Sequence, residues 1–136
     1  MYKSYKRFIG YSTAFRQWRA GSHCSLIHGY AFCFKVWFEG ELDDKGWVID
    51  FGCFKRNGVK EWLKHMFDHT TCIAADDPEL EMFKEMDNRG IIDLRILENG
   101  VGCEKFAELV ALYLQDIVHK ETDGRASVSK VQCWEH

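Results

Sequence analysis

The residues around positions 23–28 offer the clearest potential for chemistry, because His23, Cys24 and His28 lie close together there. A thiol near an imidazole can act as a base or a nucleophile when its surroundings lower its pKa. The structural alternative is a buried cysteine beside a structural histidine, since free cysteines often behave as small hydrophobic residues. His23 adds a second imidazole, although neighbouring residues of an extended segment point to opposite faces.

Two further positions carry acid–base or recognition groups. Asp68 directly precedes His69, and a carboxylate beside an imidazole can orient the ring and raise its basicity. The structural alternative for Asp68 is a turn or capping residue. Glu135 ends the last apolar segment, where a carboxylate can hold the donor edge of a flat heterocycle or simply be solvated.

Composition indicates a single domain over residues 1–136. The chain is 46% hydrophobic and 29% charged, which is typical of a globular protein. A net charge of −3 gives no general attraction to nucleic acid, and no segment approaches the ~20 apolar residues of a membrane span. The six cysteines are scattered without a CxxC pair, so we expect reduced thiols and no structural zinc ribbon. With no readable secretory signal, we expect a cytoplasmic protein.

Alternating patterns predict the strands. Residues 3–15 and 127–134 read as strands, 26–41 as a long strand, and 47–51 and 91–97 as short extended pieces. One face of the long strand is strongly apolar and carries His28, Tyr30, Phe32, Phe34, Val36 and Phe38.

Helical spacing predicts three helices, over 59–67, within 76–90 and over 103–120. The order is two strands, then helices, then at least one strand. Because no strand–helix–strand alternation repeats, we predict an α+β fold with an antiparallel sheet.

The order of several motifs resembles the family of 6-pyruvoyltetrahydropterin and 6-carboxytetrahydropterin synthases. The matching blocks are Cys24-x-x-x-His28-Gly29, residues 46–55 (GWVIDFGCFK), Asp68-His69-Thr70-Thr71, residues 103–108 (CEKFAE) and the terminal Glu135. Each block alone is weakly specific, but their order and spacing cover nearly the whole chain.

The resemblance implies a tunnelling fold, in which a four-stranded antiparallel sheet carries helices on one face. It also implies trimers whose sheets close a barrel, or hexamers of two stacked trimers, with sites for a small-molecule pterin between subunits. In the family pattern Cys24 is the general base, His69 beside Asp68 belongs to the charge relay, and Glu135 anchors the pterin. Glu104 matches a glutamate of the block that opens the long helix.

The family's zinc site is where this chain departs from the pattern. The family uses three histidines, and here Phe15 and Tyr30 stand at two of their positions, so that only His28 remains. A catalytic zinc normally has three protein ligands plus water. Three explanations stay open: the metal is lost; zinc is held by His28 with His23, Cys24 or a neighbouring subunit's residue; or the first strand is misaligned.

The resemblance implies a lyase that acts on the side chain of dihydroneopterin triphosphate. The parent reactions are elimination of triphosphate and formation of 6-carboxytetrahydropterin on the 7-deazaguanine (queuosine) route. The alternative is a non-catalytic pterin- or purine-binding protein that keeps Glu135 but needs neither Cys24 nor zinc. A structural homo-oligomer without a ligand is the third hypothesis.

Overall fold

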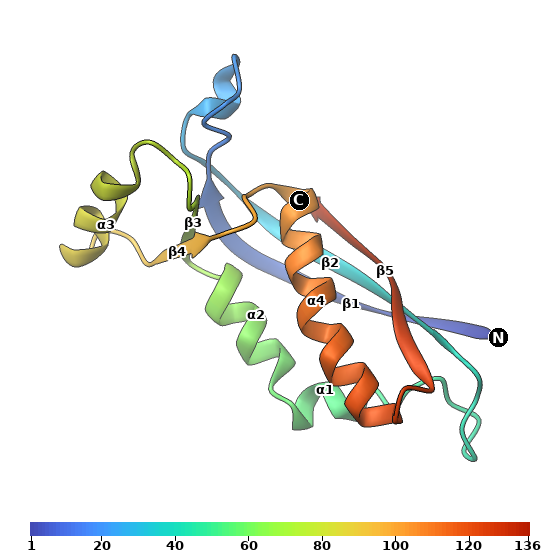
Figure 1. Ribbon diagram of the computed structural model, residues 1–136. Helices are drawn as coiled ribbons and strands as arrows, with labels where there is room; N and C mark the ends of the chain where they lie inside the picture. The colour runs from blue at the N-terminus through green and yellow to red at the C-terminus, as the bar shows by residue number, and fades with distance from the viewer.

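The computed structural model describes all residues from 1 to 136 and contains a five-stranded sheet with four α-helices and one short 3-10 helix (Figure 1). In chain order the elements are β1 (Tyr2–Phe15), η1 (His23–Ser25), β2 (His28–Gly40), α1 (Gly52–Arg56), α2 (Val59–Phe67), β3 (Thr70–Ala74), α3 (Leu80–Asn88), β4 (Leu94–Leu97), α4 (Cys103–Thr122) and β5 (Ala126–Glu135). None of the helices combines the length and apolar character needed to cross a membrane. The predicted α+β class is confirmed.

The sheet is mixed, with the strand order β4-β3-β1-β2-β5. β2 runs antiparallel to both β1 and β5, whereas β3 lies parallel to the end of β1 and β4 lies parallel to β3. The predicted four-stranded antiparallel sheet is therefore wrong. The error comes from residues 70–74, where every side chain is buried. A strand buried on both faces lacks the alternation that marks a half-exposed strand, so this segment gave no strand signal.

The core lies between the β1–β2 hairpin and the long helices. Along β2 the predicted apolar face is confirmed, with Phe32, Phe34, Val36 and Phe38 fully buried. Helices α2 and α4 contribute their predicted apolar stripes to the same core. The buried members of these stripes are Val59, Leu63, Phe67, Phe106, Val110, Leu114 and Val118.

The segment between β2 and α2 differs from the prediction. Residues 47–51 form no strand, because Val48 and Ile49 are buried side by side and cannot alternate. Asp50 Oδ1 accepts a hydrogen bond from the Gly52 N–H at 2.9 Å, and this turn opens the short helix α1 that the sequence analysis did not predict.

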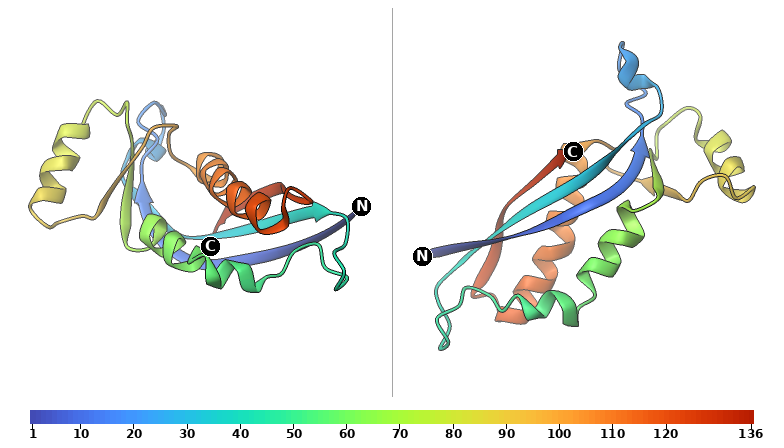
Figure 2. Two further views of the ribbon diagram at one scale, coloured as in Figure 1. Left: turned by 60° about the horizontal axis from the view of Figure 1, so that its bottom comes forward. Right: turned by 180° about the vertical axis from the view of Figure 1, so that it is seen from behind.

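Helices α1, α2 and α4 all lie on one face of the sheet, and the opposite face of β1, β2 and β5 carries no element of this chain (Figure 2). The one-sided helix layer agrees with the prediction. Helix α3 lies beyond the β3–β4 end of the sheet (Figure 1). The chain therefore presents one open sheet face and, at the end of β1 and start of β2, the loops that hold the predicted site residues.

Candidate functional site

Asp68 and His69 occupy the turn between α2 and β3. Asp68 Oδ1 lies 3.3 Å from His69 Nδ1 and accepts a hydrogen bond from the Ser12 N–H at 3.1 Å. The His69 N–H in turn donates to the Ser12 carbonyl at 2.6 Å. Both residues of the turn are thus fastened to β1, while 87% of the His69 side chain remains exposed.

The backbone of His69 is in the left-handed region, with φ of 57°. This position directly follows the end of a helix, where glycine is the usual residue. A non-glycine residue there costs about 1 kcal/mol, and such strain is often found at functional positions. The conformation ends α2 and also directs an oriented imidazole to the surface.

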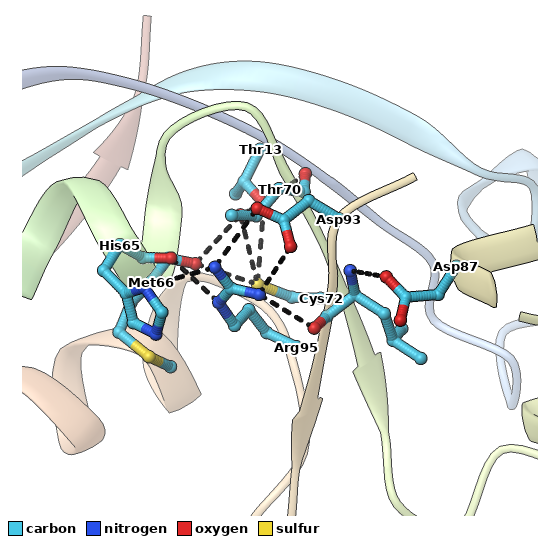
Figure 3. Close-up of polar contacts among 9 residues, drawn as sticks. Thr13, His65, Met66, Thr70, Cys72, Asp87, Asp93 and Arg95 are labelled. Atoms are coloured by element: carbon cyan, nitrogen blue, oxygen red, sulfur yellow. Dashed lines mark hydrogen bonds and ion pairs between the residues drawn. The ribbon is translucent and has the colours of Figure 1, made fainter. Parts of the chain in front are cut away.

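A buried polar network holds the base of this turn (Figure 3). The hydroxyl oxygens of Thr13 and Thr70 lie 2.7 Å apart, and each also reaches a carbonyl oxygen at 2.9 Å, that of Thr70 and that of Met66 respectively. From β4, Arg95 donates to the His65 carbonyl at 2.8 Å. The end of α2, the start of β3 and β1 are therefore joined, which gives the Asp68–His69 turn a fixed support.

Cys24 lies in the 3-10 helix of the segment that joins β1 to β2. The Gln17 N–H donates to the Cys24 carbonyl at 2.8 Å, and the Gln17 side chain donates to the Val101 carbonyl at 2.8 Å. Cys24 itself is half-buried and its N–H donates to Ser22 Oγ at 3.3 Å. His23 is exposed. The loop that carries the thiol is thus hydrogen-bonded to the segment just before α4.

A second set of contacts fixes the same loop to the connection between β3 and α3. Arg16 forms a bidentate pair with Asp77, with distances of 2.8 Å from Nε and 2.6 Å from Nη2. Next along the loop, Trp18 Nε1 and Arg19 Nη2 donate to Asp76 at 3.3 and 2.8 Å. The sequence analysis missed this clamp, because Asp76 and Asp77 resemble ordinary acidic residues before a helix and nothing in their spacing points to Arg16.

The Arg16–Asp77 pair predicts a pH-dependent stability. Asp77 is 4% exposed, and its pKa is lowered chiefly by the hydrogen bonds from Arg16. The stabilisation is therefore present above the unfolded carboxyl's pKa of about 3.9 and is lost as the pH falls through the lower folded value. We expect Asp77→Asn to lower the free energy of unfolding by about 3 kcal/mol at neutral pH, because it leaves Arg16 without its partner.

Thermal or urea unfolding at several pH values checks this prediction. The difference between the wild type and Asp77→Asn should shrink as the pH falls below about 4. Asp76→Asn is the matched control, because Asp76 is 59% exposed in its pair with Arg19, and such pairs contribute about 0–1 kcal/mol. Equal losses for the two variants would contradict the assignment.

The three positions that match the family's zinc ligands come together in space. Phe15 and His28 face each other across β1 and β2, with ring centroids 4.7 Å apart. Tyr30 follows on the same side of β2, and its ring centroid lies 5.6 Å from that of His28. Phe32 and Phe106 continue the aromatic packing beneath Phe15. The register of β1 with β2 thus places these three residues at one corner of the sheet.

The residues of this corner do not fit a three-histidine zinc centre. Phe15 has no donor atom, and a neutral tyrosine is a poor ligand for zinc. His28 Nδ1 lies 2.7 Å from the Leu26 carbonyl, which leaves only Nε2 for any other partner. No group of three or more His, Cys, Asp or Glu side chains in the chain has an arrangement suited to a metal ion.

Glu104 and Glu135 lie near each other at the start of α4 and the end of β5. Burial chiefly raises the pKa of the Cys103 thiol, and the charges of Glu135 and Glu104 raise it further. A groove of about 440 Å³ is lined by residues of α4 and β5, including Glu104, Ala107 and Trp134, the residue before Glu135. Glu135 pairs with Phe32 in the sheet register, so it lies on the helix-covered side of the sheet, as His28 does.

The predicted site residues therefore form three groups within one chain. The first is the Asp68–His69 turn. The second is the Cys24 loop with His28, whose Nδ1 lies 2.7 Å from the Leu26 carbonyl of that loop. The third is the pair Glu104 and Glu135. No hydrogen bond or ion pair joins these groups to one another. A ligand that touches all three needs a further surface to enclose it.

The mixed sheet with a one-sided helix layer and these clustered motifs define a tetrahydropterin-synthase type of fold. Residues 4–136 match the family described as 6-pyruvoyl tetrahydropterin synthase, and the chain belongs to this family. It is 34% identical over 85 residues to the 6-carboxy-5,6,7,8-tetrahydropterin synthase of Rickettsia felis. That stretch covers 62% of this chain and 59% of the relative, so the chain matches less than two thirds of the relative's length.

Solved structures share the fold at low identity. An uncharacterized protein from Wolinella succinogenes aligns with a TM-score of 0.80 and 18% identity, over 98% of this chain and 92% of its own. The 6-pyruvoyl tetrahydropterin synthase of Plasmodium vivax aligns over the full length of both chains with a TM-score of 0.64 and 13% identity. At these identities the likeness concerns the fold alone.

Proposed function

We propose that this chain is a pterin lyase that uses Cys24 as a base and the Asp68–His69 pair as a proton relay on the pterin side chain. The observation that carries the proposal is the Asp68–His69 turn. Its carboxylate is fixed by Ser12 and orients the imidazole, and the imidazole is left exposed in a strained backbone conformation. A general acid or base needs this combination of a fixed orientation and an accessible nitrogen.

The corner formed by Phe15, His28 and Tyr30 restricts which reaction the site can support. In the parent reactions a proton leaves a carbon beside a hydroxyl, and a metal on that oxygen contributes several kcal/mol of stabilisation. The Phe15–His28–Tyr30 corner offers one imidazole for that role. The proposed chemistry therefore begins with a hydroxyl proton, which is more acidic than a carbon-bound one.

In the proposed step, Cys24 thiolate accepts the hydroxyl proton of the side chain. The carbon–carbon bond beside that hydroxyl breaks, an aldehyde leaves, and the bonding electrons pass into the C=N bond of the dihydropterin ring. The protonated His69 then returns a proton to the exocyclic carbon. Glu135 and Glu104 are the proposed anchors for the N–H donors of the ring, because Glu104 lines the groove and Glu135 follows Trp134, which also lines it.

Self-association completes the site in this proposal. Only Thr13 and Ala14 of β1 pair with β3, so residues 2–11 leave one strand edge free, and the outer edge of β5 is free as well. Exposed Trp47, Phe51 and Tyr2 line a groove of about 550 Å³ beside the free edge of β1. Free edges and apolar patches of this kind are normally covered by a partner.

We expect trimers or hexamers in solution. Light scattering at micromolar concentration should give a mass of three or six chains. A charge introduced at the free edge, as in Ser4→Asp, should shift the mass toward one chain, because the half-buried Ser4 lines that groove and its buried hydroxyl has no hydrogen-bond partner. Asp44→Asn on the exposed 41–47 loop is the control. A monomeric wild type would contradict the assembly and leave the three groups without a common pocket.

A non-catalytic pterin-binding protein is the second candidate, and the aromatic corner favours it. Phe15 and Tyr30 replace metal-binding side chains with rings that pack on His28. These replacements remove metal ligands but leave the fold and both glutamates in place. This candidate requires Glu135 but not Cys24.

Turnover and binding measured on the same variants separate the two candidates. Dihydroneopterin and its triphosphate are incubated with the protein, the products are separated by chromatography, and pterin binding is followed by fluorescence quenching. A lyase loses about 10²–10⁴-fold in rate in Cys24→Ala and His69→Ala, whereas His119→Ala, on the exposed side of α4, keeps its rate. Binding without turnover in the wild type and in Cys24→Ala would establish the binding protein instead.

A further inference from the structure

The face of the sheet that no helix covers has an unusual composition. This face of the sheet is seen in Figure 2, right. By the sheet register, β1 presents on it Lys3, Tyr5 and Arg7, β2 presents Lys35, Trp37 and Glu39, and β5 presents Lys130. We call these seven residues the uncovered basic face. It carries four cations and one carboxylate, although the whole chain has a net charge of −3. Positive charge is therefore concentrated on one side of an acidic protein.

Three of these cations have no carboxylate partner. Lys3 lies 3.8 Å from Glu39, but Arg7, Lys35 and Lys130 take part in no ion pair. Arg7 lies directly opposite Lys35 in the sheet register, on strands about 5 Å apart. Like charges placed directly opposite each other destabilise a sheet. A bound anion would convert this repulsion into attraction.

Aromatic rings hold the two lysines in place. Lys35 Nζ lies 4.1 Å from the ring centroid of Tyr5 and 4.5 Å from that of Trp37. Lys130 Nζ lies 4.7 Å from the Trp37 ring, and the Tyr5 and Trp37 centroids are 5.9 Å apart. A cation–π contact restricts an ammonium group but leaves N–H donors free. The cations are thus organised before a ligand arrives, which reduces the entropy cost of binding.

We propose that the uncovered basic face is a binding site for an oligophosphate, an anion with two or more linked phosphate groups. A single carboxylate would neutralise only one of the three unpaired cations, whereas a chain of phosphates spreads its charge over neighbouring strands. The site lies on the face of the sheet opposite to Glu135, which shares the helix-covered side with Phe32. It is separate from the proposed pterin site, and it does not depend on whether the chain is a lyase.

The packing of the rings favours a small anion over a nucleic acid. Single-stranded nucleic acids bind basic grooves by stacking bases on free aromatic faces. Here Lys35 covers both Tyr5 and Trp37, and Lys130 also covers Trp37. The rings therefore position the lysines, and the ammonium groups reduce the ring area open to stacking, although Tyr5 is still 49% exposed.

Calorimetric titration of inorganic triphosphate into the full chain at low ionic strength tests the proposal. We expect saturable binding that weakens as salt is added. Lys35→Gln and Lys130→Gln should each weaken it about tenfold or more, the loss expected for one charge-assisted hydrogen bond, while Lys35→Arg should retain it. Lys45→Gln is the matched control, because Lys45 also lies over an indole ring, 5.2 Å from Trp47, but outside this face.

Three results would overturn the proposal. The first is the absence of saturable binding at millimolar triphosphate in a chain whose circular dichroism is normal. The second is an equal loss in Lys35→Gln and Lys45→Gln, which would mean that only overall charge matters. The third is displacement of triphosphate by a short single-stranded oligonucleotide at a lower phosphate concentration, which would make the face a nucleic-acid surface.

Discussion

The double variant Phe15→His with Tyr30→His will bind about one zinc ion per chain, whereas the wild type will bind far less. Phe15 and His28 face each other across β1 and β2, and Tyr30 lies next to His28 on the same side. The two substitutions therefore place three imidazoles around one point, which is the number of protein ligands typical of a catalytic zinc site. Metal analysis after zinc loading and desalting measures the outcome.

Single substitutions provide the controls. Tyr30→His supplies only two imidazoles and should bind zinc weakly, and Phe15→Leu with Tyr30→Phe should bind none while it keeps an apolar corner. Stoichiometric zinc in the wild type would contradict the prediction and point to a rearranged ligand set. His23→Ala and Cys24→Ala would then be expected to release the metal.

The zinc result also bears on the reaction. If the restored metal site gave the double variant elimination of triphosphate that the wild type lacks, the loss of ligands alone would account for the change in chemistry. If zinc bound without any gain in turnover, the rest of the site would have diverged as well. The second outcome favours the pterin-binding protein over the lyase.

Local patterns predicted the elements that are half buried. From Phe34 to Gly40, β2 alternates between buried and less buried residues. Helices α2 and α4 carry apolar residues at helical spacing. The bounds of all three elements agree with the prediction to within about two residues. In such elements the hydrophobic period of the sequence matches the pattern of burial, because one side of each element faces the core and the other faces solvent.

Elements without that asymmetry were not predicted. All five residues of β3 are buried, and α1 has five residues, too few to display a helical period. Because β3 was not predicted, its parallel pairing with β1 could not be predicted either. The antiparallel sheet was therefore predicted from an incomplete set of strands.

Motif order located the candidate site residues, but it did not reveal what holds them. Asp68 and His69 are adjacent in sequence, so their pairing could be inferred, whereas the contacts of Asp68 with Ser12 and of Arg16 with Asp77 join residues more than fifty positions apart. Such contacts follow from the sheet register and the loop path. Neither can be obtained from one sequence without the fold.

Cys24 will react with iodoacetamide at neutral pH faster than the other five cysteines. Cys33, Cys53 and Cys72 are buried, and the pKa of Cys53 is raised to about 11, chiefly by burial. Burial also raises the pKa of the Cys103 and Cys133 thiols, so little thiolate is present at either. Cys24 lies half-buried on a surface loop. Mass spectrometry of peptides after short exposures gives the rate for each thiol.

Preferential labelling alone does not establish catalysis, because accessibility already favours Cys24. The informative comparison is the pH profile of the labelling rate in the wild type and in His69→Ala. If His69 and Cys24 share a site in the assembled protein, removing the imidazole removes a nearby positive charge, so the rate at neutral pH falls and its rise moves to higher pH. His119→Ala controls for loss of an exposed imidazole elsewhere. An unchanged profile in His69→Ala would mean that the two residues act apart, and Cys24 would then lose its assignment as the base that works with the Asp68–His69 relay.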